Sequence, residues 1–214
     1  MDKTRILILC AGTLGMFIQM LLRRKHFPQV ALWKLPVISV FLTLAGVAGA
    51  MLMHFIENGS FGGTSLFGSI FFIPIFLLPV LSLRVKFTTL MDLCAPAECL
   101  MLVLMKLDCQ LSGCCFGKYL PALEIQFPSQ IIEMIVFFVI MLLLIQLERK
   151  EENKGRIYGH YLIIYGIARF ILNWFRYGVA PFVWILPAGN FWSLVAIALG
   201  VIWLIVVRPK ATSR

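Results

Sequence analysis

The most regular feature of this sequence is a repetition of long apolar runs separated by short polar stretches. Seven runs can be drawn, each close to the ~20 residues that an α-helix needs to cross a bilayer. They cover residues 6–22, 35–56, 66–83, 87–107, 131–147, 157–175 and 191–207. The pattern predicts an all-α integral membrane protein, with one bundle of seven transmembrane helices over residues 1–214 and no soluble domain.

The fourth run needs a second argument, because it contains Asp92, Pro96, Glu98 and Lys106. With seven spans, one side of the membrane holds thirteen positive residues: Arg23, Arg24, Lys25, Lys34, Arg84, Lys86, Arg149, Lys150, Lys154, Arg156, Arg208, Lys210 and Arg214. The other side holds four, which are Lys3, Arg5, Lys118 and Arg176. Without the fourth span, the same residues divide eight against nine. The positive-inside rule therefore favours seven spans, with the N-terminus outside and the C-terminus in the cytoplasm.

Composition agrees with a membrane protein. Apolar residues make up 61% of the chain and charged residues 14%, and the mean hydropathy is +0.94. The net charge of +9 would suggest a nucleic-acid partner in a soluble protein. Here the positive residues lie in short segments beside apolar runs, as membrane topology requires. We therefore expect no nucleic-acid partner.

The sixth run carries an unusual set of polar side chains. Tyr165, Arg169, Asn173 and Arg176 fall on one helical stripe, about 80° wide at 100° per residue. An arginine at the centre of a membrane helix costs roughly 2.5–3.5 kcal/mol on insertion scales. We therefore expect this face to be functional. The alternative is that Arg169 only forms an interhelical ion pair with an acidic residue, Glu98 or Glu133.

Several irregular features meet on the outer side in this topology. They include the Gly-rich segment 58–63 and the segment 108–130, which contains Gly113-Cys114-Cys115-Phe116-Gly117. Lys106 ends the fourth run at the same level, and His54 lies near the outer end of the second. Irregular backbone at membrane depth is tolerated where it lines a cavity. We expect a cationic cavity, open outward, that binds the phosphate of a lipid head group.

Four segments of the chain resemble, in order, the motifs of one known family. Met105–Gly117 (MKLDCQLSGCCFG) is similar to the signature Gly-Arg-Ile-Gly-Asn-Phe-x-Asn-Gly-Glu-x-x-Gly, and Pro128–Glu133 (PSQIIE) to Pro-Ser-Gln-x-x-Glu. Tyr165–Arg176 (YGIARFILNWFR) resembles Tyr-Gly-x-x-Arg-Phe-x-x-Glu-x-x-Arg. Gly189–Ser193 (GNFWS) resembles Gly-Gln-x-x-Ser. These are motifs of the prolipoprotein diacylglyceryl transferase family, which the chain therefore resembles over most of its length and in agreement with the seven-span topology.

The resemblance implies a reaction in the bacterial cytoplasmic (inner) membrane. A diacylglyceryl group moves from phosphatidylglycerol to the lipobox cysteine thiol of a pre-lipoprotein, and glycerol phosphate is released. The implied partners are phosphatidylglycerol, the signal-peptide and lipobox region of pre-lipoproteins, and membrane lipids. No cofactor and no metal are implied.

Such a reaction needs positive charge on the leaving phosphate and an acceptor for the thiol proton. Arg169 and Lys106 are the expected charge stabilisers. His54 is the candidate base, with Asp108 and Glu98 as carboxylate alternatives. The expected substrate-binding residues are Arg176, Tyr165, Asn173, Gly62, Gly68, Gly113, Gly117 and Cys109.

The sequence also departs from the family pattern. Phe67-Gly68-Ser69 stands where the family has His-Gly-Gly. The signature arginine is Lys106, its first asparagine is Cys109 and its acidic residue is Cys114, while Asn173 replaces the acid of the sixth span. The phosphate-binding residues are thus better preserved than the acid–base residues.

Two further interpretations follow from these departures. Cys109, Cys114 and Cys115 could belong to a membrane thiol–disulfide oxidoreductase, although there is no Cys-x-x-Cys. A zinc site is not expected, because two well-spaced ligand pairs are lacking. The chain could also be a diverged, non-catalytic lipid-binding relative. A transferase would need Arg169 and tolerate serine at the three cysteines, a redox enzyme would need the cysteines, and a binder would make no product.

Overall fold

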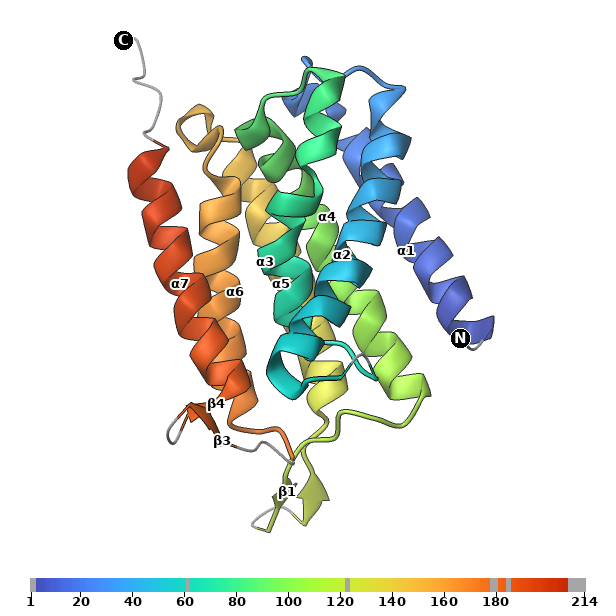
Figure 1. Cartoon of the computed structure of the whole chain (residues 1–214), viewed down its shortest axis with the longest axis vertical. Helices are drawn as coiled ribbons and strands as arrows, with labels where there is room; N and C mark the ends of the chain where they lie inside the picture. Colours follow the sequence, from blue (N-terminus) through green and yellow to red (C-terminus); the bar gives the residue numbers. More distant parts are fainter. Residues whose placement is uncertain (1–2, 61, 122–123, 178–180, 184–185, 208–214) are drawn as a thin grey trace.

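The computed structural model describes residues 3–60, 62–121, 124–177, 181–183 and 186–207. Within these ranges the chain forms seven α-helices whose axes lie roughly along one line, up or down the bundle (Figure 1). They are α1 (Lys3–Leu22), α2 (Lys34–Asn58), α3 (Leu66–Phe76), α4 (Phe87–Leu111), α5 (Ser129–Glu148), α6 (Ile157–Asn173) and α7 (Ala188–Val206). The all-α class and the seven helices predicted from the apolar runs are confirmed.

Short elements connect the helices. Three 3₁₀ helices span Arg24–His26, Leu78–Leu83 and Glu151–Asn153. Strands β1 (Tyr119–Leu120) and β2 (Ile125–Gln126) form one antiparallel hairpin, in which Tyr119 pairs with Gln126. Strands β3 (Pro181–Val183) and β4 (Leu186–Pro187) form a second. Both hairpins lie at the same end of the bundle, which we call the hairpin end (Figure 1).

Four helices are long and apolar enough to cross a membrane: Thr4–Leu22, Lys34–Asn58, Ser129–Glu148 and Ala188–Val206. The other three helices are shorter or less apolar than this, each because of a feature of its own sequence. The predicted third span is divided into α3, which contains Pro74, and the 3₁₀ helix that follows it. Helix α6 has 17 residues, and α4 carries charged side chains.

Helix α4 tolerates its charges because it lies inside the bundle. It packs against α1, α5 and α6, and every residue from Leu90 to Cys99 is buried. The Asp92 carboxylate accepts hydrogen bonds from the backbone N–H groups of Gly155 (2.5 Å) and Tyr158 (3.3 Å). The Asp92 carboxylate is thus stabilised by backbone donors inside the protein rather than exposed to lipid.

The helices alternate in direction. Helix α1 starts at the hairpin end and α7 finishes at the opposite end (Figure 1). The α2–α3, α4–α5 and α6–α7 connections all lie at the hairpin end. Arg23, Arg84 and Arg149 follow helices that end on the other side, whereas Arg208, Lys210 and Arg214 lie outside the described residues. The direction of the bundle in a membrane stays a prediction.

Candidate functional site

A cavity of about 610 Å³ opens at the hairpin end, between the ends of α2, α4 and α6. Both polar and apolar groups line it. Six of the residues singled out from the sequence lie in its wall: His54, Lys106, Cys109, Arg169, Asn173 and Arg176. The structure therefore brings together residues from three helices that are far apart in the sequence.

The centre of the cationic wall is Glu133, on α5. Its Oε2 atom lies 2.6 Å from Lys106 Nζ and 2.7 Å from Arg169 Nη1. Its Oε1 atom lies 3.8 Å from Arg176 Nε. Lys106, Glu133 and Arg169 are at most 3% exposed, whereas the Arg176 side chain is 24% exposed. We call these four residues the Glu133 cluster.

The Glu133 cluster has more positive than negative charge. Three cationic side chains share one carboxylate, so two positive charges have no counter-charge within the cluster. In addition, Arg169 Nε has no hydrogen-bond partner among the described residues. A buried charged donor without a partner is costly. The arrangement is therefore suited to receive an anion from the cavity.

The interhelical ion pair expected for Arg169 in the alternative interpretation is confirmed, and its partner is Glu133. The other acidic candidate, Glu98, lines a separate apolar cavity beside Ser69. Because Lys106 and Arg176 share the same carboxylate, the ion pair does not neutralise the site.

The residues of the polar stripe on α6 have two different environments. Tyr165 is fully buried, with its ring 5.7 Å from Phe67 and 5.6 Å from Phe137, and it does not line the cavity. Asn173, two turns further on, lines the cavity and donates a hydrogen bond to Asn190 Oδ1 (2.5 Å). Thus only the turns of the stripe nearest the hairpin end reach the site.

Comparison with known proteins shows the family of this chain. Residues 6–206 match the sequence model of a family described as prolipoprotein diacylglyceryl transferase. The chain belongs to this family. It is 30% identical over 126 residues to a phosphatidylglycerol–prolipoprotein diacylglyceryl transferase of Clostridium tetani, covering 52% of this chain and 51% of the relative. It is 28% identical over 127 residues to a phosphatidylglycerol–prolipoprotein diacylglyceryl transferase 2 of Clostridium perfringens, covering 53% and 50%. The chain thus matches about half the length of these relatives.

The histidine candidate lies in the cavity wall. His54 Nδ1 is 3.1 Å from the side-chain nitrogen of Asn58, one helical turn later on α2. A side chain at Gly63 would collide with the His54 ring, so the glycine makes room for the imidazole. Phe67, which stands at the histidine position of the family motif, is 3% exposed. His54 is thus the histidine that the cavity offers.

The predicted glycines do not line the cavity. A Cβ at Gly68 would collide with the carbonyl oxygen of Gly49, so Gly68 allows close packing of α2 and α3. Gly62 is exposed, with no atom within 4 Å of its Cβ position. Gly113 has φ +62°, which favours glycine. A Cβ at Gly117 would collide with the Phe127 carbonyl oxygen. Gly68, Gly113 and Gly117 thus shape the backbone around the site, whereas nothing in the structure requires glycine at position 62.

Gly117 also joins two segments of the site. It forms an isolated β-bridge with Arg176, and Lys118 N donates to the carbonyl of Phe175 (2.8 Å). Tyr177 N donates to the carbonyl of Phe116 (3.1 Å). The segment after α4 is therefore paired with the end of α6, which positions Arg176 beside the cavity.

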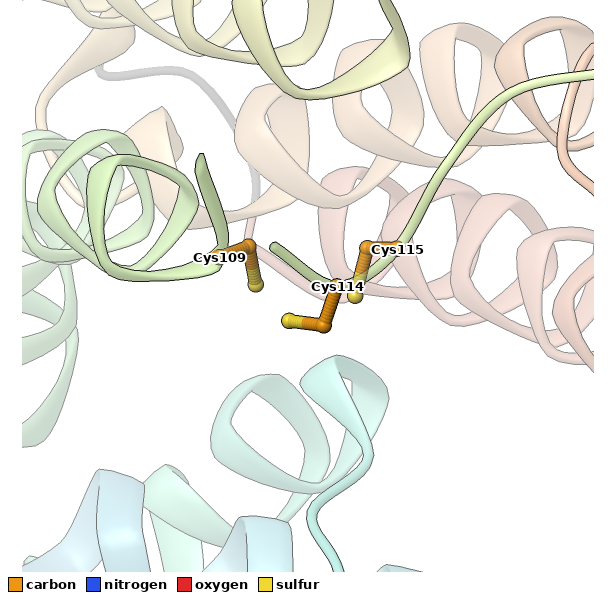
Figure 2. A group of neighbouring side chains, drawn as sticks. All are labelled: Cys109, Cys114 and Cys115. Atoms are coloured by element: carbon orange, nitrogen blue, oxygen red, sulfur yellow. The ribbon is translucent and has the colours of Figure 1, made fainter. Parts of the chain in front are cut away.

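Three thiols meet at the end of α4. The Sγ atoms of Cys109, Cys114 and Cys115 all lie within 4.8 Å of one another (Figure 2). All three cysteines are free, and Cys109 and Cys115 line the cavity. A hydrogen bond from the Cys109 thiol, with help from the charges of Lys106 and Arg176, lowers the pKa of Cys115 to about 5. Burial raises the pKa of Cys114.

Two features of this site were not predicted from the sequence. Glu133 was expected only as a possible partner of Arg169, although it closes the Pro-Ser-Gln-x-x-Glu segment and contacts three cations. Cys109 was the only cysteine expected to contact substrate, although Cys115 lines the same cavity. The Pro-Ser-Gln-x-x-Glu segment was a signal for Glu133, and the adjacent cysteines were a signal for Cys115.

Proposed function

We propose that this protein transfers a diacylglyceryl group from phosphatidylglycerol to the lipobox cysteine thiol of pre-lipoproteins. Family membership supports this class of reaction, and the relatives carry the corresponding names. The observation that carries the proposal is the uncompensated positive charge of the Glu133 cluster. A phosphodiester head group supplies the anion that the cluster lacks.

The cationic side chains have different roles, according to how deeply each is buried. Arg169 and Lys106 are buried and stabilise the charge that grows on the leaving phosphate as its ester bond breaks. Arg176 is partly exposed and holds the incoming head group. Guanidinium groups suit this role because their planar N–H fork matches phosphate oxygens in pairs.

The acceptor thiol must lose its proton before it attacks carbon. His54 lines the same cavity, and an imidazole can accept a proton near neutral pH. Neither Asp108 nor Glu98 is among the residues that line this cavity. Glu57 does line it, but its carboxylate accepts a hydrogen bond from Ser65 Oγ (3.1 Å). His54 is therefore the proposed base, and Asn58 holds its ring in position.

The reaction requires the hairpin end to face outward from the bacterial cytoplasmic membrane. We expect a reporter fused after Arg214 to be cytoplasmic and a tag inserted near Glu124 to be accessible from outside. The positive residues that follow α1, α3 and α5 give the physical reason. A C-terminal reporter that reads external in intact cells would contradict this topology and the outward cavity.

A non-catalytic lipid-binding protein is the second candidate. The replacement of the motif histidine by Phe67, whose ring packs in the core, favours it. A cationic cavity can bind a head group without cleaving it. The two candidates differ in product rather than in lipid affinity.

The test is expression of the chain in a bacterium depleted of its own transferase, with mass spectrometry of a reporter lipoprotein. We expect the reporter to gain the mass of one diacylglyceryl group on its lipobox cysteine. A reporter with Ser at that position is the matched control and should stay unmodified. An unmodified cysteine reporter, with the protein present in the membrane, would favour the lipid binder.

A further inference from the structure

The three thiols of Figure 2 have the spacing of a metal site. A tetrahedral zinc ion binds thiolate sulfur at ~2.3 Å, which places the sulfurs about 3.8 Å from one another. The Sγ atoms of Cys109, Cys114 and Cys115 already lie within 4.8 Å of one another. Small rotations of the side chains would therefore bring all three onto one ion.

The backbone holds this arrangement in place. Cys115 has φ +60°, a left-handed conformation that a residue with a side chain rarely adopts. Its carbonyl accepts a hydrogen bond from Ser129 Oγ (2.6 Å), and the Cys114 carbonyl accepts one from Gln130 Nε2 (2.6 Å). The first turn of α5 thus fixes the turn that gathers the thiols, and Cys114 N bonds back to the carbonyl of Cys109.

The charge around the thiols also suits a metal complex. Zn²⁺ with three thiolates carries one net negative charge. Cys109 and Cys115 share their cavity with Lys106, Arg169 and Arg176, which supply positive charge. Thiolate ligands select soft cations such as Zn²⁺ over Mg²⁺ or Ca²⁺. Three protein ligands, with one position left open, are the ligand number of catalytic zinc sites.

We infer that Cys109, Cys114 and Cys115 bind a zinc ion whose open fourth position takes the acceptor thiol of the pre-lipoprotein. This inference rests on the proposed transferase function. It departs from the expectations that the chain has no metal site and that serine is tolerated at the three cysteines. The first expectation depended on linear spacing, which does not show the convergence of the three side chains. The second came from the transferase interpretation, which gave the cysteines no part in the reaction.

The proposed transfer changes no oxidation state. On binding to Zn²⁺ the acceptor thiol gives up its proton, which passes to the His54 imidazole directly or through water. The thiolate attacks the glyceryl carbon that carries the phosphate ester. The C–S bond forms as the C–O bond breaks, and the electron pair stays on the phosphate oxygen of the leaving glycerol phosphate. Zn²⁺ keeps its charge and releases the thioether, a weaker ligand than a thiolate.

The proposal gives a reason for the departures from the family pattern. Cys109 and Cys114 stand at positions that resemble the signature asparagine and acid, and Phe67 stands where the family has histidine. A zinc-bound thiol needs a weaker base than a free thiol. The cysteines would therefore compensate for the lost acid–base residues in the same cavity.

The first test is the zinc content of the reduced, detergent-purified full chain after Zn²⁺ loading and desalting. We expect one zinc per wild-type chain. Cys109→Ser and Cys115→Ser each remove a direct ligand. Each should weaken Zn²⁺ binding by about tenfold or more, because even the loss of a group that only supports a ligand costs about 10- to 100-fold. Cys10→Ser changes an exposed cysteine on α1 and should bind like the wild type. Zinc-free wild type, or unchanged zinc in both site variants, would overturn the inference.

The second test examines the open position, with Co²⁺ in place of Zn²⁺. A lipobox peptide should change the visible absorption of the Co²⁺ protein, because its thiolate joins the metal. The same peptide with Ser for Cys should cause no change. An identical response to both peptides would contradict the assigned role of the metal.

The metal inference and the proposed function can fail separately. Arg169→Ala should keep its zinc and lose transfer, because Arg169 acts on the phosphate. Zinc bound by a wild-type protein that makes no product would contradict the transferase and leave the site standing. Full transfer by protein stripped of zinc with a chelator would overturn the inference and leave the transferase standing.

Discussion

The two ends of the bundle each bury an arginine against a glutamate, and they do so differently. At the end opposite the hairpins, Arg23 pairs with Glu148 and donates to the Gln19 side chain and to the carbonyls of Asp92 and Leu93. Every nitrogen of its guanidinium has a partner. This arginine is fully used within the protein.

At the hairpin end, the corresponding arginine has partners for only some of its hydrogen-bond donors. Arg169 pairs with Glu133 through Nη1, while its Nε has no partner among the residues the structure describes. Lys106 and Arg176 compete for the same carboxylate, and all three cations line a cavity. Saturation of the donors thus separates a structural arginine from one available to a ligand.

The largest expected effect is on catalysis at Arg169. Arg169→Ala should lower the transfer rate a hundredfold or more, since losing one such electrostatic partner costs ~3 kcal/mol or more of barrier. Arg169→Lys should restore little, because an ammonium group cannot reproduce the planar fork. Rates are measured with purified protein in phosphatidylglycerol vesicles. Normal turnover by Arg169→Ala would remove this residue from the mechanism.

Arg23→Ala should act on stability instead. It leaves Glu148 buried without its partner, which typically costs about 3–5 kcal/mol. We expect a lower thermal midpoint in detergent, with the transfer rate per folded molecule near that of the wild type. Loss of turnover in protein shown to be folded would contradict the division between the two ends.

Glu133→Gln should destabilise the hairpin end and make its stability more dependent on a bound anion. It leaves Lys106, Arg169 and Arg176 without a counter-charge, so the protein should unfold at a lower temperature. Glycerol phosphate should restore more stability to this variant than to the wild type; a ligand at 100 times its Kd contributes about 2.7 kcal/mol. Thermal unfolding with and without the compound measures this. Equal shifts in both proteins would contradict anion binding at the cluster.

The smallest expected effect is at Tyr165. Its hydroxyl has no hydrogen-bond partner among the residues described, and it does not line the cavity. Tyr165→Phe should therefore change stability by less than about 1 kcal/mol, because no hydrogen bond is lost. Activity should be close to wild type. A large loss of activity would return Tyr165 to the substrate-binding role expected from the sequence.

The helices were predictable because apolar runs of membrane length carry a strong signal, and α4 because the charge distribution required it. The site was predictable in part. Angular periodicity placed Tyr165 and Asn173 on one stripe of α6, but it does not report depth along the helix. Tyr165 packs between Phe67 and Phe137, and only the turns nearer the hairpin end reach the cavity.

The cysteine cluster was not predictable for a different reason. Its geometry depends on two left-handed residues, Gly113 and Cys115, and on two hydrogen bonds from the start of α5. These are contacts between segments that a linear spacing rule does not contain. The same holds for Glu133, whose three partners lie on α4, on α6 and in the segment just after α6.

We propose that the cationic cavity cleaves a phospholipid and does not merely bind it. The most direct measurement uses purified protein in phosphatidylglycerol vesicles with a lipobox peptide, and quantifies the two products together by mass spectrometry. We predict diacylglyceryl peptide and glycerol phosphate in equal amounts, and neither product from Arg169→Ala. Peptide that stays unmodified, with no glycerol phosphate released by the wild type, would contradict the account.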